Sequence, residues 1–149
     1  MTQAFIRLHR NQRGTALIEM ALTLPLMLLV SAGIFEFGRA YQTWQVITNA
    51  AREGARLAVL PGTTDGDVQT RVRTYMSDGQ LTSATSATVN INRAATIAVG
   101  AGTASASRIT VNYPFTFVVL QPIARLVATG SQVGAPLTMT VSALMRNEQ

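Results

Sequence analysis

Residues 14–35, with the sequence GTALIEMALTLPLMLLVSAGIF, decide the fold, because they form one apolar run that contains a single acid, Glu19. About 20 residues of α-helix at 1.5 Å rise cross the hydrocarbon core of a bilayer, so this run is long enough to span one. A charge at the centre of such a helix costs about 2.5–3.5 kcal/mol, and less near its end. Glu19 is therefore either an interfacial residue or a functional carboxylate. We favour the second, because ionisable residues in membrane segments usually serve a function.

The segment before the apolar run is basic and predicts the orientation of the chain. It holds no acid and four basic or titratable residues, Arg7, His9, Arg10 and Arg13. Basic flanks stay in the cytoplasm, so the rest of the chain is expected outside. A removable secretory signal is the alternative, with a shorter apolar core of about 7–15 residues and a small-residue cleavage site. Residues 31–33 would serve as that site, but apolar residues continue to Phe37, which favours a retained anchor.

Composition narrows the possible functions. The 149 residues leave room for one modest domain beside the membrane segment. The net charge of +5 comes largely from the basic flank, and the remaining arginines form no stripe, so nucleic-acid binding is not expected. There is no cysteine, and the single histidine is His9 in the flank. We therefore expect no enzyme, no cofactor and no metal site.

The helix is expected to continue beyond the bilayer. Glu36 and Arg39, three residues apart, read as a weak surface pair at the exit, and Tyr41 and Trp44 suit an interfacial aromatic belt. Small or apolar residues then recur every three or four positions as far as residues 61–62, Pro-Gly, which end the helix. Small residues on one face let another element approach closely. The sequence thus predicts a helix from about 16 to 60 with an amphipathic outer half.

Three residues of this helix have two readings each. Pro25 removes one hydrogen bond and kinks the helix, either as a packing feature or as a flexible point that helps the helix leave the bilayer. Arg52 and Arg56, one turn apart, either pair with a carboxylate of a partner or lie on a solvated face. The sequence leaves both questions open.

The remainder reads as mixed α and β. Val68, Val72 and Tyr75 or Met76 predict a short amphipathic helix that ends at residues 78–79. Alternating apolar residues predict three strands, over about 88–99, 109–119 and 137–145, that cover the long helix. Loops are expected at 83–86, 101–107 and 129–136, and Pro114 places the second strand at an edge or bulge. Asp65 and Asp67 are either a weak calcium loop or, as we favour, a helix cap formed by Asp67.

Several motifs together resemble the TadE-like family, pseudopilins or minor pilins of tight-adherence, Flp-type pilus systems. The motifs are RGTALIE at 13–19, LPL at 24–26, GIFEFG at 33–38, NAAREGAR at 49–56 and LTMTVSA at 137–143. A glycine, four residues, a glutamate and an apolar helix also resemble a class III prepilin signal. The chain departs from that pattern at Met20, where related pilins usually carry an aromatic residue, and at Thr15, where other type IV pilins often carry Phe.

The resemblance implies processing and assembly. A prepilin peptidase would cut after Gly14 and leave Thr15 as the new N-terminus, which is then open to N-methylation. Glu19 would then lie about 6 Å along the helix from that amine and neutralise the amine of a neighbouring subunit. The expected partners are this peptidase, other pilin or pseudopilin subunits, the inner-membrane pilus machinery and the lipid bilayer.

The expected organisation has three parts and an α+β fold. A basic leader spans 1–14, a transmembrane helix spans 15–38, and a periplasmic domain spans 39–149, with helix over 39–60 and mixed α/β structure over 61–149. The chain is expected in the inner membrane with its N-terminus cytoplasmic, before any incorporation into a pilus. The alternative is an uncleaved, single-pass membrane protein whose outer domain binds a ligand or partner.

Overall fold

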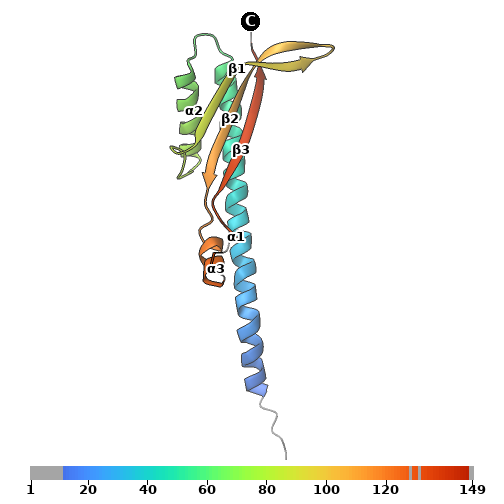
Figure 1. The fold of residues 1–149 in the computed structure, drawn as a ribbon, viewed down its shortest axis with the longest axis vertical. Helices are drawn as coiled ribbons and strands as arrows, with labels where there is room; N and C mark the ends of the chain where they lie inside the picture. Colours follow the sequence, from blue (N-terminus) through green and yellow to red (C-terminus); the bar gives the residue numbers. More distant parts are fainter. Residues whose placement is uncertain (1–11, 128, 131, 148–149) are drawn as a thin grey trace, which may run out of the picture. The chain divides into compact units, whose positions relative to one another are not determined.

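The fold is α+β, as predicted, and consists of three helices and three strands over the described residues. The structure, a computed structural model, describes residues 12–127, 129–130 and 132–147. Its elements are α1 Gln12–Ala58, α2 Asp65–Asp78, β1 Thr88–Val99, β2 Gly102–Phe115, α3 Leu120–Val127 and β3 Leu137–Arg146 (Figure 1). The chain divides into two compact units, Met1–Phe35 and Glu36–Gln149, which we describe separately. Most of the predicted leader, 1–11, lies outside the described residues.

The first unit holds the apolar part of α1. Its large apolar side chains are exposed along the whole run, from Leu17 at 72% to Phe35 at 56%. Within the described residues, α1 is the one helix long and apolar enough to span a membrane. Pro25 lies inside α1, and the helix continues on both sides of it. Exposed apolar side chains at this density require an apolar environment such as lipid or other helices.

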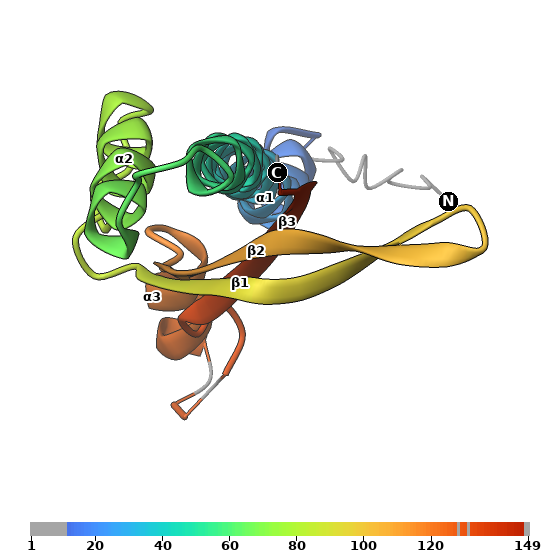
Figure 2. The same ribbon diagram turned by 90° about the horizontal axis from the view of Figure 1, so that it is seen from above.

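The second unit is built from a sheet with two helices on one face. The strand order is β1-β2-β3, and both pairs are antiparallel. The outer half of α1 and all of α2 lie on the same side of this sheet (Figure 2). Apolar residues align across the sheet, for example Val89 opposite Val111 and Val111 opposite Val141. This alignment gives the sheet a single apolar face, as the alternating pattern predicts.

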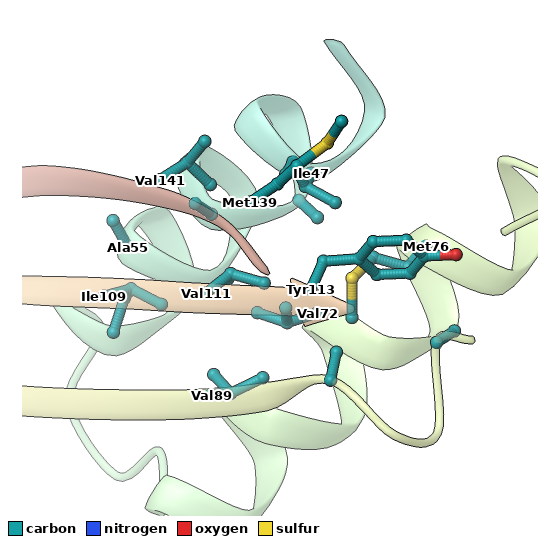
Figure 3. Packing of buried hydrophobic residues seen from close by; sticks show 14 of the residues in the cluster. Ile47, Ala55, Val72, Met76, Val89, Ile109, Val111, Tyr113, Met139 and Val141 are labelled. Carbon is teal, nitrogen blue, oxygen red and sulfur yellow. The ribbon is translucent and has the colours of Figure 1, made fainter. Parts of the chain in front are cut away.

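The core lies between that face and the helices (Figure 3). Ile47 and Ala55 from α1, Val72 and Met76 from α2, and Ile109 from β2 point into it and are fully buried. Gly54 is also buried, and a Cβ there would lie 2.4 Å from Cγ2 of Val72. The small residues of α1 thus allow the close approach that the sequence predicts.

Helix α2 begins with a capping box, and its N-cap is a different residue from the predicted one. Thr64 is the N-cap, and its Oγ1 accepts a hydrogen bond from Asp67 N at 3.2 Å. The Asp67 carboxylate accepts one in return from Thr64 N at 2.9 Å. These hydrogen bonds from Thr64 lower the pKa of Asp67. Asp67 therefore belongs to the cap as its third helical residue, and the prediction that it is the N-cap itself was wrong.

The β1–β2 hairpin differs from the predicted strands. The expected loop over 101–107 is wrong, because β2 starts at Gly102 and pairs with β1 as far as Val99. Residues 101–107 have small side chains and lack the large apolar residues that usually indicate a strand, so the sequence pattern did not predict one here. β2 is also the central strand, not an edge. Pro114 is tolerated because the β1 register ends at Asn112, so that side of β2 is locally unpaired.

Arg93 ties this hairpin to the end of α1. The register between β1 and β2 shifts between Asn92 and Ala95, which is the position of a β-bulge. From this bulge the guanidinium donates to Ala58 O at 2.7 Å and to Thr63 O at 3.0 Å. It also pairs with Asp65 at 2.7 Å. The guanidinium thus satisfies the Ala58 carbonyl at the negative end of the α1 dipole and a carbonyl of the loop that follows.

Candidate functional site

The residues predicted for processing lie in the first turns of α1. Gly14 is half-buried, and no atom outside its local backbone would lie within 4 Å of a Cβ built there. Thr15 and Glu19 are exposed. Within the described part of the chain, the Glu19 carboxylate has no hydrogen bond or ion pair, while its carbonyl accepts one from Thr23 Oγ1. Glu19 is thus an exposed acid on an apolar helix without a partner in its own described chain.

A second glutamate, Glu36, is the most enclosed charged residue of the described chain. Its side chain is 0% exposed, although it directly follows the apolar run. Its Oε1 accepts hydrogen bonds from Val118 N, at 2.7 Å, and from Val119 N. Its Oε2 accepts one from Arg39 Nη1 at 2.9 Å. We call this group of four residues the Glu36 clamp.

The clamp fixes the start of α3, a helix that the sequence analysis did not predict. The Val119 carbonyl accepts the first helical hydrogen bond, from Ile123 N at 3.3 Å. The Glu36 carboxylate therefore satisfies two backbone donors at the positive end of α3. Because these donors follow Glu36 by 82 and 83 residues, the clamp joins distant parts of the chain.

Two aromatic rings lie beside the Glu36 clamp. The Arg39 guanidinium carbon lies 5.4 Å from the centre of the Phe115 ring, within cation–π range. Phe115 in turn meets Phe117 edge-on, with ring centres 5.1 Å apart. The prediction that Glu36 and Arg39 form a weak surface pair is therefore wrong. The sequence offered one indication of this site, an acid at the end of the apolar run and inside the GIFEFG motif. The donors that Glu36 accepts from at Val118 and Val119 are backbone amides, which no residue type identifies.

Arg56, one of the two arginines proposed to meet a partner, is engaged within the chain. Glu53 pairs with Arg56 at 2.8 Å and with Arg71 of α2 at 3.0 Å. The Arg56 hydrogen bond, supported by that of Arg71 and opposed by partial burial, lowers the pKa of Glu53 from 4.5 to about 2. Arg52 is exposed, and its Nη1 lies 3.5 Å from Asn49 Oδ1. Contact of either arginine with a partner stays a prediction.

The other candidate chemistries find no arrangement to support them in the part of the chain that the structure describes. Asp65 pairs with Arg93 and Asp67 serves the α2 cap, so each acid has a structural partner. Among the described residues, no group of three or more His, Asp or Glu side chains could hold a metal ion.

Comparison with known proteins places α1 in a family. Residues 14–56 match the family described as "TadE-like protein", so the chain carries a TadE-like domain over these residues. The match lies within α1 and includes Gly14, Glu19 and the Glu36–Arg39 pair, but neither α2 nor the sheet. No curated protein and no solved structure matches the chain significantly. The family resemblance predicted from the sequence is confirmed.

Proposed function

We propose that this chain is a pilin-like membrane subunit, a pseudopilin or minor pilin, that takes part in assembling a tight-adherence, Flp-type pilus. The observation that carries the proposal is the TadE-like domain over 14–56. The exposed apolar part of α1 supports it, because such a helix can reside in a membrane and then pack among other subunits. The role is structural, with no catalytic step assigned to the chain.

Processing precedes assembly in this proposal. A prepilin peptidase hydrolyses the Gly14–Thr15 peptide bond, which releases the basic leader and leaves an α-ammonium on Thr15. The exposed Glu19 carboxylate lies four residues further along α1, about 6 Å along the axis. An isolated charge in lipid is costly, and two opposite charges in contact reduce that cost. Staggered subunits therefore associate by placing the Glu19 of one beside the Thr15 ammonium of another.

The remaining parts have matching roles. The apolar part of α1 anchors the subunit in the inner membrane, with the leader cytoplasmic and the sheet domain periplasmic. Other pilin subunits and the inner-membrane pilus machinery are the partners. The Glu36 clamp holds α3 and the start of the β2–β3 connection against α1, so the domain presents a fixed surface to them.

Substitution at the processing site tests the proposal. Gly14→Val should leave the leader attached and prevent pilus formation, because a branched side chain would stand beside the scissile bond. Gly33→Val is the matched control, since Gly33 lies on the same helix and a Cβ built there also meets no atom outside the local backbone within 4 Å. A Gly14→Val protein that is shortened normally and supports piliation would contradict the proposal.

The Glu19 carboxylate is tested separately. Glu19→Ala should be cleaved like the wild-type chain but should no longer co-purify with other pilin subunits. Thr23→Ala, one turn further along α1, is the control and should behave like the wild type in both assays. Normal piliation with Glu19→Ala would refute the charge pairing while leaving the processing step intact.

A further inference from the structure

A polar pocket of about 180 Å³ lies where the outer half of α1, the loop after α2 and the end of β2 meet. We call it the Arg39 pocket, after the one charged side chain among the described residues that line it. Neutral polar side chains, among them Gln42, Thr43 and Tyr113, supply much of the remaining lining. The proposed function gives this pocket no role. A single cation among neutral polar groups suits an anionic ligand.

The Arg39 guanidinium is held in place before any ligand binds. Its Nη1 donates to Glu36 at 2.9 Å, and its central carbon lies 5.4 Å from the centre of the Phe115 ring. The other two nitrogens, Nε and Nη2, have no hydrogen bond within the described residues, and the side chain is 34% exposed. Glu36 itself does not line the pocket. A ligand there therefore meets spare donors of a cation whose position is already fixed.

Two hydroxyl groups line the same pocket. Thr43 is only 6% exposed, and its hydroxyl makes no hydrogen bond within the described residues. Every fully enclosed side-chain nitrogen or oxygen in the described chain has a partner, so this hydroxyl must reach the open space that Thr43 lines. The Tyr113 hydroxyl accepts a hydrogen bond from Ser83 N at 3.2 Å, which leaves its own hydrogen to donate.

These donors define the chemistry of the ligand as an oxyanion. Arginine and hydroxyl groups form short, strong hydrogen bonds with phosphate and carboxylate oxygens. Because no acid lines the pocket among the described residues, a ligand group that carries an ammonium finds no partner there. The pocket is several times larger than the roughly 30 Å³ that one water molecule occupies, so it has room for a phosphate.

The place of Arg39 in the chain favours a lipid as the source of that phosphate. Arg39 follows Phe35, the last residue of the apolar run, by four residues, which is about 6 Å of α-helix. The headgroup layer extends about 5–8 Å beyond the hydrocarbon core on each side. With Phe35 at the hydrocarbon boundary, Arg39 lies at the depth of the lipid phosphates. An anion from solution or from a partner protein would have to compete with them.

We propose that the Arg39 pocket binds the phosphate of an anionic phospholipid whose headgroup carries no ammonium, such as phosphatidylglycerol. Arg39 neutralises the phosphate, and the Thr43 and Tyr113 hydroxyls donate to its oxygens. The bound lipid thereby joins α1, the loop after α2 and β2 at the membrane surface. The inference rests on the membrane anchoring in the proposed function, but not on cleavage at Gly14 or on pilus assembly.

Native mass spectrometry tests the proposal. The full chain is reconstituted in nanodiscs of phosphatidylglycerol and phosphatidylcholine in equal parts and released into mild detergent, and its retained lipids are identified. The wild type should retain phosphatidylglycerol in preference. Thr43→Val keeps the shape of the side chain but loses the hydroxyl, so retention should fall roughly tenfold, as for one hydrogen bond to a charged group. Thr48→Val is the matched control, because Thr48 lies on the same helix but does not line the pocket.

Soluble competitors distinguish the sources of the anion. Neither inorganic phosphate nor acetate should displace the lipid at millimolar concentration. Displacement by phosphate would assign the pocket to a free phosphate, and displacement by acetate to the carboxylate of a partner, so either would overturn the lipid proposal. Equal retention of the two lipids, or of phosphatidylglycerol by Thr43→Val and the wild type, would also overturn it. A chain that enters nanodiscs and retains no lipid would refute this inference alone, whereas a chain that fails to enter them would also contradict the proposed anchoring.

Hydrogen exchange gives a second readout within the bilayer. The Ser83 amide, which donates to Tyr113, should exchange more slowly in nanodiscs of phosphatidylglycerol than in nanodiscs of phosphatidylcholine. In Thr43→Val this difference should disappear, while the amides of β2 near Ile109 stay protected in both lipids and show that the variant is folded. Equal exchange of Ser83 in the two lipids for the wild type would overturn the proposal.

Discussion

Replacing Glu36 should release the start of α3 from α1. Glu36→Ala removes the acceptor for Val118 N, Val119 N and the Arg39 guanidinium. A hydrogen bond to a charged group contributes about 1.5–3 kcal/mol, so three would sum to about 4.5–9 kcal/mol. The Arg39 side chain is 34% exposed, so water partly replaces the lost partner. We therefore expect a loss of about 2–4 kcal/mol in the free energy of unfolding of the outer domain.

Graded substitutions separate charge from shape at this site. Glu36→Gln keeps one carbonyl oxygen for the two backbone donors but loses the charge, so a smaller loss of about 1–2 kcal/mol is expected. Glu53→Gln is the control for removing an acid from α1, because its arginine partners are 61% and 50% exposed. That change should cost less than about 1 kcal/mol.

Hydrogen exchange of the full chain in detergent micelles provides the direct assay. In the wild type, the amides of Val118 and Val119 should be protected. In Glu36→Ala they should exchange at the rate of an open loop, while the amides of β2 near Ile109 remain protected. Unchanged protection of Val118 and Val119 in Glu36→Ala would refute the clamp, as would an equal loss of protection in Glu53→Gln.

Three further predictions concern the packing and charges of the outer domain. Gly54→Ala should lower the free energy of unfolding by about 1–3 kcal/mol in a denaturation experiment, because its Cβ would meet Val72, whereas Gly38→Ala should be neutral or slightly stabilising. Because the pKa of Glu53 is lower in the folded chain, its contribution is present above pH 4.5 and is lost as the pH falls towards 2. Allowing for the exposure of its partners, this loss is about 1 kcal/mol, and Glu53→Gln should remove it from the acid limb of a stability–pH profile. Arg93→Ala should cost about 1–3 kcal/mol and increase proteolysis after α1, because the carbonyl of Ala58 at the end of that helix and the carbonyl of Thr63 in the following loop lose their donor.

Most of the fold could be predicted from periodic patterns in the sequence. The apolar run, the small-residue face of α1 and the alternating apolar residues of β2 each repeat over enough positions to identify the element and its buried face. Ile109, Val111 and Tyr113 are buried as this alternation requires. The long helix was predicted to within a few residues at each end, and α2 ends at Asp78 as expected.

Features that depend on distant partners could not be predicted in this way. Residues 101–107 pair as a strand because β1 lies beside them, although their own side chains are small. Helix α3 starts where the Glu36 carboxylate accepts hydrogen bonds from the backbone, and no residue type around Pro122 indicates that contact. Glu36 was read as a surface residue because an acid after an apolar run normally faces water. Its partners became visible only in three dimensions.

The site predictions differ in the same way. Gly14, Thr15 and Glu19 were predicted from local spacing, and the family match begins at the first of them. Tyr41 and Trp44 were predicted to form an interfacial aromatic belt, and both side chains are exposed on α1.

The intact mass of the protein extracted from membranes tests the proposed function most directly. In cells with an active prepilin peptidase, the chain should begin at Thr15, and in cells without that peptidase it should begin at Met1. A chain that keeps its arginine-rich leader in piliated cells would contradict the proposed role and leave an anchored α+β domain without an assembly function.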